Sequence, residues 1–259
     1  MSASVGPVAV NTFREAVRDR VLYNLVLFAL LMIGAAILVG QISIGIEQLV
    51  IVNLGLSAIS LFGLVMSIFI GVGLVYKEIE KRTLYSLLAK PIHRWQFLVG
   101  KYAGLLLTLA VNTAFMTLGL AAAFFYVGGR FEHANLSILI AIYFILLEFA
   151  LVTALALFFS CFSTPMLSTL FTLAIYVTGV FAPDIRSISE FTNNSMLLAV
   201  TRALYFLIPN FHDFNVIAVA GHGEPIPFSL VWQNTLYAGL YVALLLVAAS
   251  AVFSRRNLK

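Results

Sequence analysis

The sequence predicts an all-α protein that crosses a membrane several times. Hydrophobic residues make up 62% of the 259 residues and charged residues only 10%, whereas soluble globular domains carry about 25% charged residues. Six apolar stretches approach the ~20 residues that a helix needs to cross ~30 Å of hydrocarbon. The mean hydropathy of +1.04 excludes a soluble globular fold. We therefore expect one transmembrane domain over residues 1–259.

The six predicted transmembrane helices are separated by short polar connections. The spans are expected at residues 21–40, 55–76, 99–126, 136–160, 165–182 and 230–253. The connection at 41–54 carries Glu47 as its only charged residue, and the connection at 161–164 is a tight turn before Pro165. No internal repeat or second domain is evident.

The residues before the first span are predicted to form an interfacial elbow helix at 7–20. Pro7 suits the first turn of a helix. An apolar stripe then lies opposite a charged face; the stripe comprises Val10, Phe13, Val17 and Val21, and the charged face Arg14, Asp19 and Arg20. A charged flank without a helix is the alternative. No small-residue cleavage pattern follows, so we expect the first span to remain as an anchor.

The distribution of basic residues predicts the orientation. Six spans place both termini on one side, and twelve Lys and Arg residues then fall on the side of the termini and the 77–101 connection. Only Arg130, Arg186 and Arg202 fall on the other side. The positive-inside rule makes the first side cytoplasmic, in a cell (inner) membrane. This topology also explains the net charge of +4, so no nucleic-acid partner is expected.

The connection between the second and third spans is the most charged part of the chain. Residues 76–104 hold eight of the Lys, Arg, Asp and Glu residues. An apolar stripe at helical spacing predicts an amphipathic helix; it comprises Tyr76, Ile79, Thr83, Leu84, Leu87 and Leu88. Pro91 ends the helix, because a proline disfavours the α conformation of the residue before it. Such a helix either lies in the lipid interface or docks a soluble partner.

The order of residues in this connection resembles that of type-2 ATP-binding-cassette (ABC) exporter permeases. The family pattern reads roughly E-x-E-x-x-T-L-x-x-L-L-x-x-P-[IV]-x-R-x-x-F-L-x-G-K, and the chain matches it from Glu78 to Lys101. Arg82 stands where many members carry glycine, and this departure resembles the branch associated with maturation of nitrous-oxide reductase and multicopper enzymes. Farther along, LYFLIPNFHDFN at 204–215 and the ending FSRRNLK are similar to other segments of the family.

The resemblance implies a permease subunit that moves substrate with the energy of ATP hydrolysis in a separate subunit. Two cytoplasmic ABC ATPases would bind ATP and magnesium, and this chain would bind no cofactor. The helix at 77–89 would be the coupling helix; its expected ATPase contacts are Glu78, Glu80, Lys81, Arg82, Thr83, Leu84 and Leu87. A second copy of the chain or a similar subunit would complete the unit, with an extracytoplasmic accessory protein as a further partner. Gly100-Lys101 is not a Walker motif, because Tyr102 follows where Ser or Thr is required.

Residues 183–229 are expected to form a long outer loop whose apolar piece lies on the outer leaflet or dips into it. The apolar piece at 195–208 is too short to span, contains Arg202 and stops at Pro209. A seventh span would also place the basic tail outside. We therefore expect a short outer-leaflet helix between the fifth and sixth spans.

Glu148 is the only acidic residue deep within a predicted span. A charge at mid-membrane costs about 2.5 to 3.5 kcal/mol, so this side chain is expected to face protein or a water-filled cavity. One interpretation is a cavity or gating residue. The other is a neutral glutamic acid bonded to a neighbouring helix, through Thr153 or a tyrosine elsewhere.

Two other function classes compete with a permease. A membrane-embedded enzyme would need clustered catalytic side chains, and Glu148 has no second acid or base beside it, so no catalytic residue is predicted. A membrane anchor that recruits a soluble complex is the third class. The four histidines share no metal-ligand spacing, and the single cysteine, Cys161, has no partner for a disulfide, so no metal site is predicted. The sequence does not identify the substrate.

Overall fold

A computed structural model describes residues 5–43, 45–80, 94–128, 134–183 and 208–255. Within these ranges the chain is helical and has no strand, which confirms the all-α class. The helices are α1 (Val5–Val17), α2 (Arg20–Ile42), α3 (Glu47–Glu80), α5 (Arg94–Tyr126), α6 (Ala134–Ser160), α7 (Pro165–Val180), the 3-10 helix η1 (His212–Phe214), α10 (Ile217–Gly221) and α11 (Phe228–Arg255).

Five of these helices are long and apolar enough to cross a membrane, namely α2, α3, α5, α6 and α11. The 16 residues of α7 rise about 24 Å, which is less than the ~30 Å of a hydrocarbon core. The predicted spans at 21–40, 99–126, 136–160 and 230–253 each lie within one of the five long helices. The count of six spans stays a prediction.

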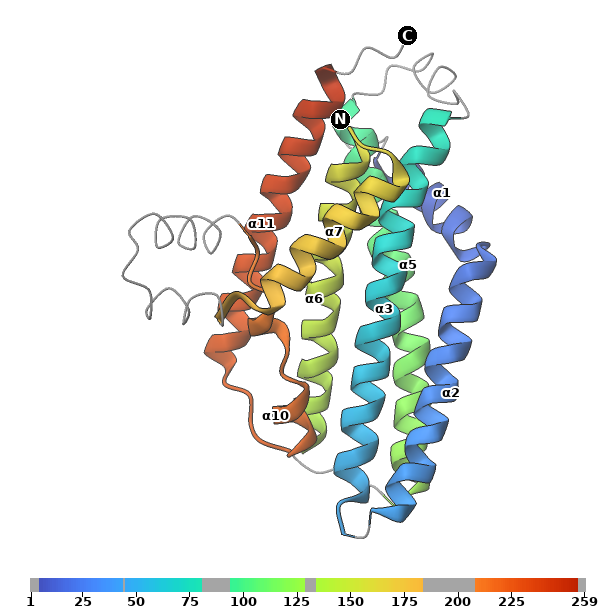
Figure 1. The fold of residues 1–259 in the computed structure, drawn as a ribbon, viewed down its shortest axis with the longest axis vertical. Helices are drawn as coiled ribbons and strands as arrows, with labels where there is room; N and C mark the ends of the chain where they lie inside the picture. The colour runs from blue at the N-terminus through green and yellow to red at the C-terminus, as the bar shows by residue number, and fades with distance from the viewer. Residues whose placement is uncertain (1–4, 44, 81–93, 129–133, 184–207, 256–259) are drawn as a thin grey trace.

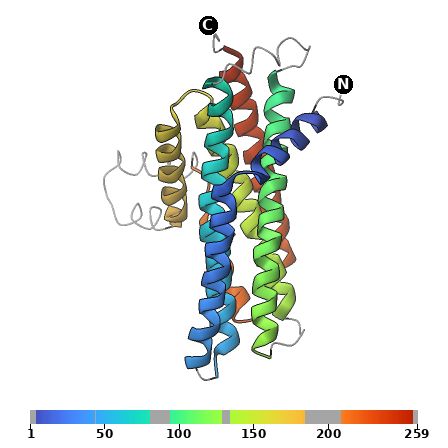
Figure 2. The same cartoon turned by 90° about the vertical axis from the view of Figure 1, so that its right-hand side faces the viewer.

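The long helices form an upright bundle (Figure 1). The start of α1, the end of α3, the start of α5 and the end of α11 gather at one end, which we call the termini end (Figures 1 and 2). The turn from α2 to α3 and the short α10 lie at the opposite end (Figure 1). The charged connection that follows α3 therefore leaves the bundle at the termini end.

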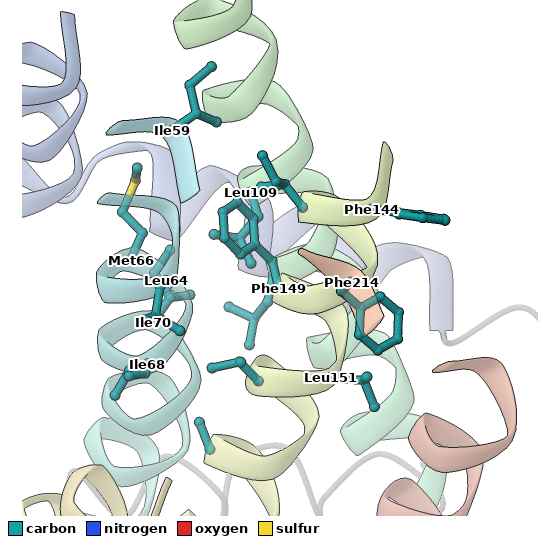
Figure 3. Close-up of a cluster of buried hydrophobic side chains, with 14 of the residues drawn as sticks. Ile59, Leu64, Met66, Ile68, Ile70, Leu109, Phe144, Phe149, Leu151 and Phe214 are labelled. Carbon is teal, nitrogen blue, oxygen red and sulfur yellow. The ribbon is translucent and has the colours of Figure 1, made fainter. Parts of the chain in front are cut away.

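Helix α6 is the central column of the bundle. Of its most apolar window, 61% is buried, compared with 22% for α2 and for α11. Its neighbours are α3, α5, α7, α10 and α11. Figure 3 shows Phe149 of α6 among side chains of α3 and α5, such as Met66 and Leu109. Residues 151–157 are all buried, so no face of this part of α6 is left for lipid.

The first connection is shorter than predicted. The polar residues Glu47 and Gln48 suggested a loop over 41–54, but α3 already begins at Glu47. A carboxylate in the first turn stabilises a helix through the helix dipole, so the charge marks the start of the helix rather than a loop. Gly45, with a φ of 86°, makes the tight turn in a conformation that other residues rarely adopt.

The elbow helix is present as α1, and the sequence did not predict which residues it buries against the bundle. Thr12 and Ala16 are buried, whereas Val10 is 48% exposed. Thr12 packs on α5, where a Cβ added to Gly104 would lie 2.7 Å from the Cβ of Thr12. Close backbone approach thus decides which side of α1 meets the bundle, and the larger apolar residues do not.

Candidate functional site

The predicted coupling segment is only partly described. Glu78 and Glu80 lie in the last turn of α3, whereas Lys81, Arg82, Thr83, Leu84 and Leu87 lie outside the described residues. The structure gives no break after Tyr76, where we expected the span to end, and α3 continues through Glu80. Residues 77–80 are therefore a continuation of the span and not the start of a separate helix.

The length of α3 carries Glu78 and Glu80 away from the apolar body. Its 34 residues rise about 51 Å, some 20 Å more than a hydrocarbon core is thick. The apolar part of the helix ends at Tyr76, directly before Lys77. Helix α3 is therefore a continuous rod that joins the apolar bundle to the charged connection at the termini end (Figure 1).

The first turns of α5, which follow that connection, are fixed on several sides. Lys101 is only 2% exposed, and its ammonium lies 5.2 Å from the ring centre of Phe97. The Phe97 ring stacks on Phe253 of α11 at 6.4 Å. The Gly100 and Gly104 positions accept α1 at close range, which confirms the packing role that a GxxxG-like pair predicts. The start of α5 is thus held between α1 and α11.

Both helices that border the charged connection are also bonded to α6. The Tyr102 hydroxyl of α5 donates to the carbonyl oxygen of Ala150 at 3.1 Å. The Ser160 hydroxyl of α6 donates to the carbonyl oxygen of Val72, on α3, at 3.2 Å. These bonds lie within the bundle, so α3 and α5 are both tied to the central helix by hydrogen bonds with which water does not compete.

Three consecutive residues of α6 face three different helices. Glu148 accepts a hydrogen bond from Tyr176 of α7. Phe149 packs on α3 at Gly63, where a Cβ would overlap its ring (Figure 3). Ala150 accepts the hydrogen bond from Tyr102 of α5 described above. Residues 148–150 are therefore the point at which α3, α5 and α7 meet the central column.

Glu148 is buried, and its described hydrogen-bond partner is a tyrosine. The Tyr176 hydroxyl donates to Oε1 of Glu148 at 2.7 Å. The alternative partner, Thr153, has a buried hydroxyl without a hydrogen bond among the described residues. The structure therefore contains a hydrogen bond from Glu148 to a neighbouring helix, and Tyr176 rather than Thr153 is the partner.

The segment 209–215, which contains the short 3-10 helix η1, covers the Glu148–Tyr176 pair. The Phe211 ring lies 5.0 Å from that of Tyr176, and the Phe211 amide donates to the carbonyl oxygen of Gly179 at 3.1 Å. On the other side, the Tyr237 hydroxyl of α11 accepts from the amide of Asn210 at 3.0 Å. Phe211 and Phe214 are 1% exposed, so this part of the predicted outer loop at 183–229 packs into the bundle.

Glu148 also borders a cavity of about 60 Å³ between α3, α6, α7 and the 209–215 segment. Polar side chains contribute to its lining; they are Ser60, Glu148, Tyr176, His212 and Asn215. A polar cavity of this size has room for water. Glu148 thus contacts a neighbouring helix and borders a small cavity.

Sequence reasoning identified Glu148 but missed Tyr176 and the covering segment. Tyr176 was one of ten tyrosines with nothing local to single it out. The segment carried a signal in Phe211 and Phe214, two aromatic residues three apart between polar ones, which fits a short turn that buries one side. Among the described residues no group of three or more His, Cys, Asp and Glu converges as a metal site.

The fold and this site define a class of protein. It is a multi-pass helical membrane protein whose spans meet around one buried acid, and the two helices that border its charged connection end and begin at the termini end. The family model described as ABC-2 family transporter protein matches residues 7–258. The chain therefore belongs to the ABC-2 transporter family, whose members are membrane permease subunits without an ATP site of their own. Among curated proteins the comparison finds no match.

Proposed function

We propose that this chain is the ATP-coupled permease subunit of an ABC exporter in the cytoplasmic membrane. Two separate ATPase subunits bind ATP and magnesium and dock on the connection at 77–89. The single observation that carries this function is the family match over residues 7–258. The chain crosses the membrane six times, with α7 as the fifth span, and both termini lie in the cytoplasm beside the docking segment.

The described contacts supply a route for the coupling. A partner that moves the docking segment pulls on α3 and on α5, because the segment joins the two helices. Helix α1 moves with α5, since Gly104 leaves no room between them. The bonds of Tyr102 and Ser160 pass the motion to α6. Packed helices transmit such displacements as discrete shifts.

Glu148 is the proposed gating residue at the far end of this route. Its bond to Tyr176 joins α6 to α7, and Phe211 packs on the same tyrosine. A shift of α6 that lengthens this bond would release α7 and the 209–215 segment together. The substrate path would then open beside the small cavity, at an interface with a second copy of the chain or with a similar subunit.

The resemblance to the branch that matures nitrous-oxide reductase and multicopper enzymes remains a proposal about the substrate class. It depends on Arg82 at a position where many family members carry glycine. An extracytoplasmic accessory protein would be consistent with that branch.

Purification from the native host, followed by reconstitution in vesicles, tests the coupling. The wild-type chain is expected to retain an ATPase polypeptide, identified by mass spectrometry, and the vesicles to hydrolyse ATP. Leu84→Asp places a charge on the apolar stripe of the docking segment, so the partner and the hydrolysis should both be lost. Retention of both by the Leu84→Asp complex would show that ATPase docking does not depend on this segment.

A matched pair of charge reversals separates docking from general electrostatics. Arg82→Glu and Arg255→Glu each change the charge by the same amount at the termini end, but only Arg82 belongs to the docking segment. We expect loss of the ATPase only with Arg82→Glu. Equal loss with both variants would attribute docking to the overall positive charge of this end.

A further inference from the structure

The end of the molecule opposite the termini contains a cavity of about 620 Å³. It lies between the α2–α3 turn, the end of α5, the start of α6 and α10, and the turn and α10 are visible at the bottom of Figure 1. The volume falls in the range of small-molecule sites. Polar side chains from two elements contribute to the lining; they are Glu47 and Gln48 of α3 and His222 after α10. The cavity therefore suits a polar group of several atoms.

An apolar groove of about 110 Å³ runs from this cavity along α5 and α6. The cavity and the groove share Val52, Phe124 and Ile138, so the two spaces adjoin. Thr117 is the one residue with a polar side chain in the groove lining. A polar cavity that continues as an apolar groove has the shape and chemistry of an amphiphile.

The surroundings of the groove identify its occupant as a bilayer lipid. The groove lies on α5 and α6, both long and apolar enough to span a membrane. Phe125 is 43% and Leu139 is 60% exposed at its rim, so the groove is open to the side, where lipid chains surround a membrane protein. The cavity is at the ends of the spans, at the depth of lipid headgroups.

The charge of the cavity selects the type of headgroup. Glu47 is the one charged residue in the described lining. The ring Nδ1 of His222 lies 2.8 Å from the carbonyl oxygen of Ala218, so the imidazole is fixed in place. A carboxylate attracts an ammonium group and repels an anionic headgroup.

We propose that this cavity and groove bind one bilayer lipid with an ethanolamine headgroup, its ammonium beside Glu47 and one acyl chain between α5 and α6. The site is separate from the docking segment and from Glu148, and it holds lipid without ATP. Lipid binding at this site therefore does not depend on the proposed coupling to an ATPase.

The test uses the full-length chain in lipid nanodiscs with a phosphatidylethanolamine that carries a photoactivatable diazirine on its acyl chain. Labelling without nucleotide should place adducts on peptides 117–125 and 138–142. Phosphatidylglycerol with the same chain should label these peptides about fivefold less, which corresponds to the upper end of a solvent-accessible ion pair. Unlabelled ethanolamine lipid should compete more strongly than unlabelled glycerol lipid.

Two matched pairs of variants localise the site. Ala121→Trp fills the groove, whereas Ala122→Trp adds the same ring at the next, exposed position outside the lining. Only the first should abolish labelling of the two peptides. Glu47→Gln should reduce the fivefold headgroup preference to about one, and Glu224→Gln, outside the cavity lining, should leave it unchanged.

Equal labelling by the two headgroups in the wild-type chain would overturn the headgroup assignment. Equal labelling of Ala121→Trp and Ala122→Trp would overturn the groove as the chain site. Competition on the wild-type chain decides the headgroup question even where a variant fails to fold.

Discussion

Gly104 provides a direct test of how the elbow helix is held. A Cβ at this position would lie 2.5 Å from the carbonyl oxygen of Ala9 and 2.7 Å from the Cβ of Thr12. The first of these atoms belongs to the backbone, so Gly104→Ala forces α1 away from α5. Over-packing of this kind costs about 1 to 3 kcal/mol, and Gly→Ala within a helix gains back about 1 kcal/mol. We expect a net loss of up to about 2 kcal/mol of stability.

The single cysteine reports the result. Cys161 is buried, so a thiol-reactive fluorophore labels it only as the bundle opens on heating in detergent. For a chain of this size, the expected loss lowers the midpoint of labelling by up to about 8 °C. Gly239→Ala is the control, because a Cβ at Gly239 of α11 meets nothing within 4 Å. A Gly104→Ala midpoint at or above that of Gly239→Ala would refute the packing of α1 on α5 at this position.

Two further predictions use the same labelling assay. Tyr176→Phe removes the 2.7 Å bond to Glu148 and should lower stability by about 1 kcal/mol, the size of hydrogen bonds between membrane helices. Glu148→Gln keeps an acceptor for the same bond and should lower stability by less. An equal loss in the two variants would show that the charge of Glu148 contributes to the bond. Gly63→Ala should destabilise the bundle because its Cβ overlaps the Phe149 ring, whereas the Cβ of the control Gly73→Ala meets nothing within 4 Å. Similar labelling midpoints for these two variants would mean that α3 and α6 are farther apart than in this structure.

Composition was sufficient to predict the long helices. Residues 136–160 form an uninterrupted apolar stretch apart from a few small polar residues and Glu148, and α6 covers the same range. In hydrocarbon every backbone polar group must be bonded internally, so an apolar stretch of this length has few alternatives to a helix. The class of fold follows from this one constraint.

The contacts between helices were harder to predict because apolar side chains look alike in a sequence. Nothing in the sequence of α1 singled out Thr12, which is buried against Gly104 of α5. Tyr176 and Phe211 reach Glu148 from segments 28 and 63 positions away in the sequence. Such long-range pairs have no local signal, and the ATPase contacts at 81–87 lie outside the described residues.

The central place of α6 has a consequence for biosynthesis. When this helix first enters the membrane, α7 and α11 have not yet been synthesised, and its acidic side chain meets lipid at a cost of about 2.5 to 3.5 kcal/mol. The turn at 161–164 is short, so α7 emerges immediately afterwards and brings the phenol of Tyr176 to the carboxyl group. Because α6 and α7 follow each other directly in the sequence, the nascent chain exposes the unpaired acid to the bilayer for only a short time.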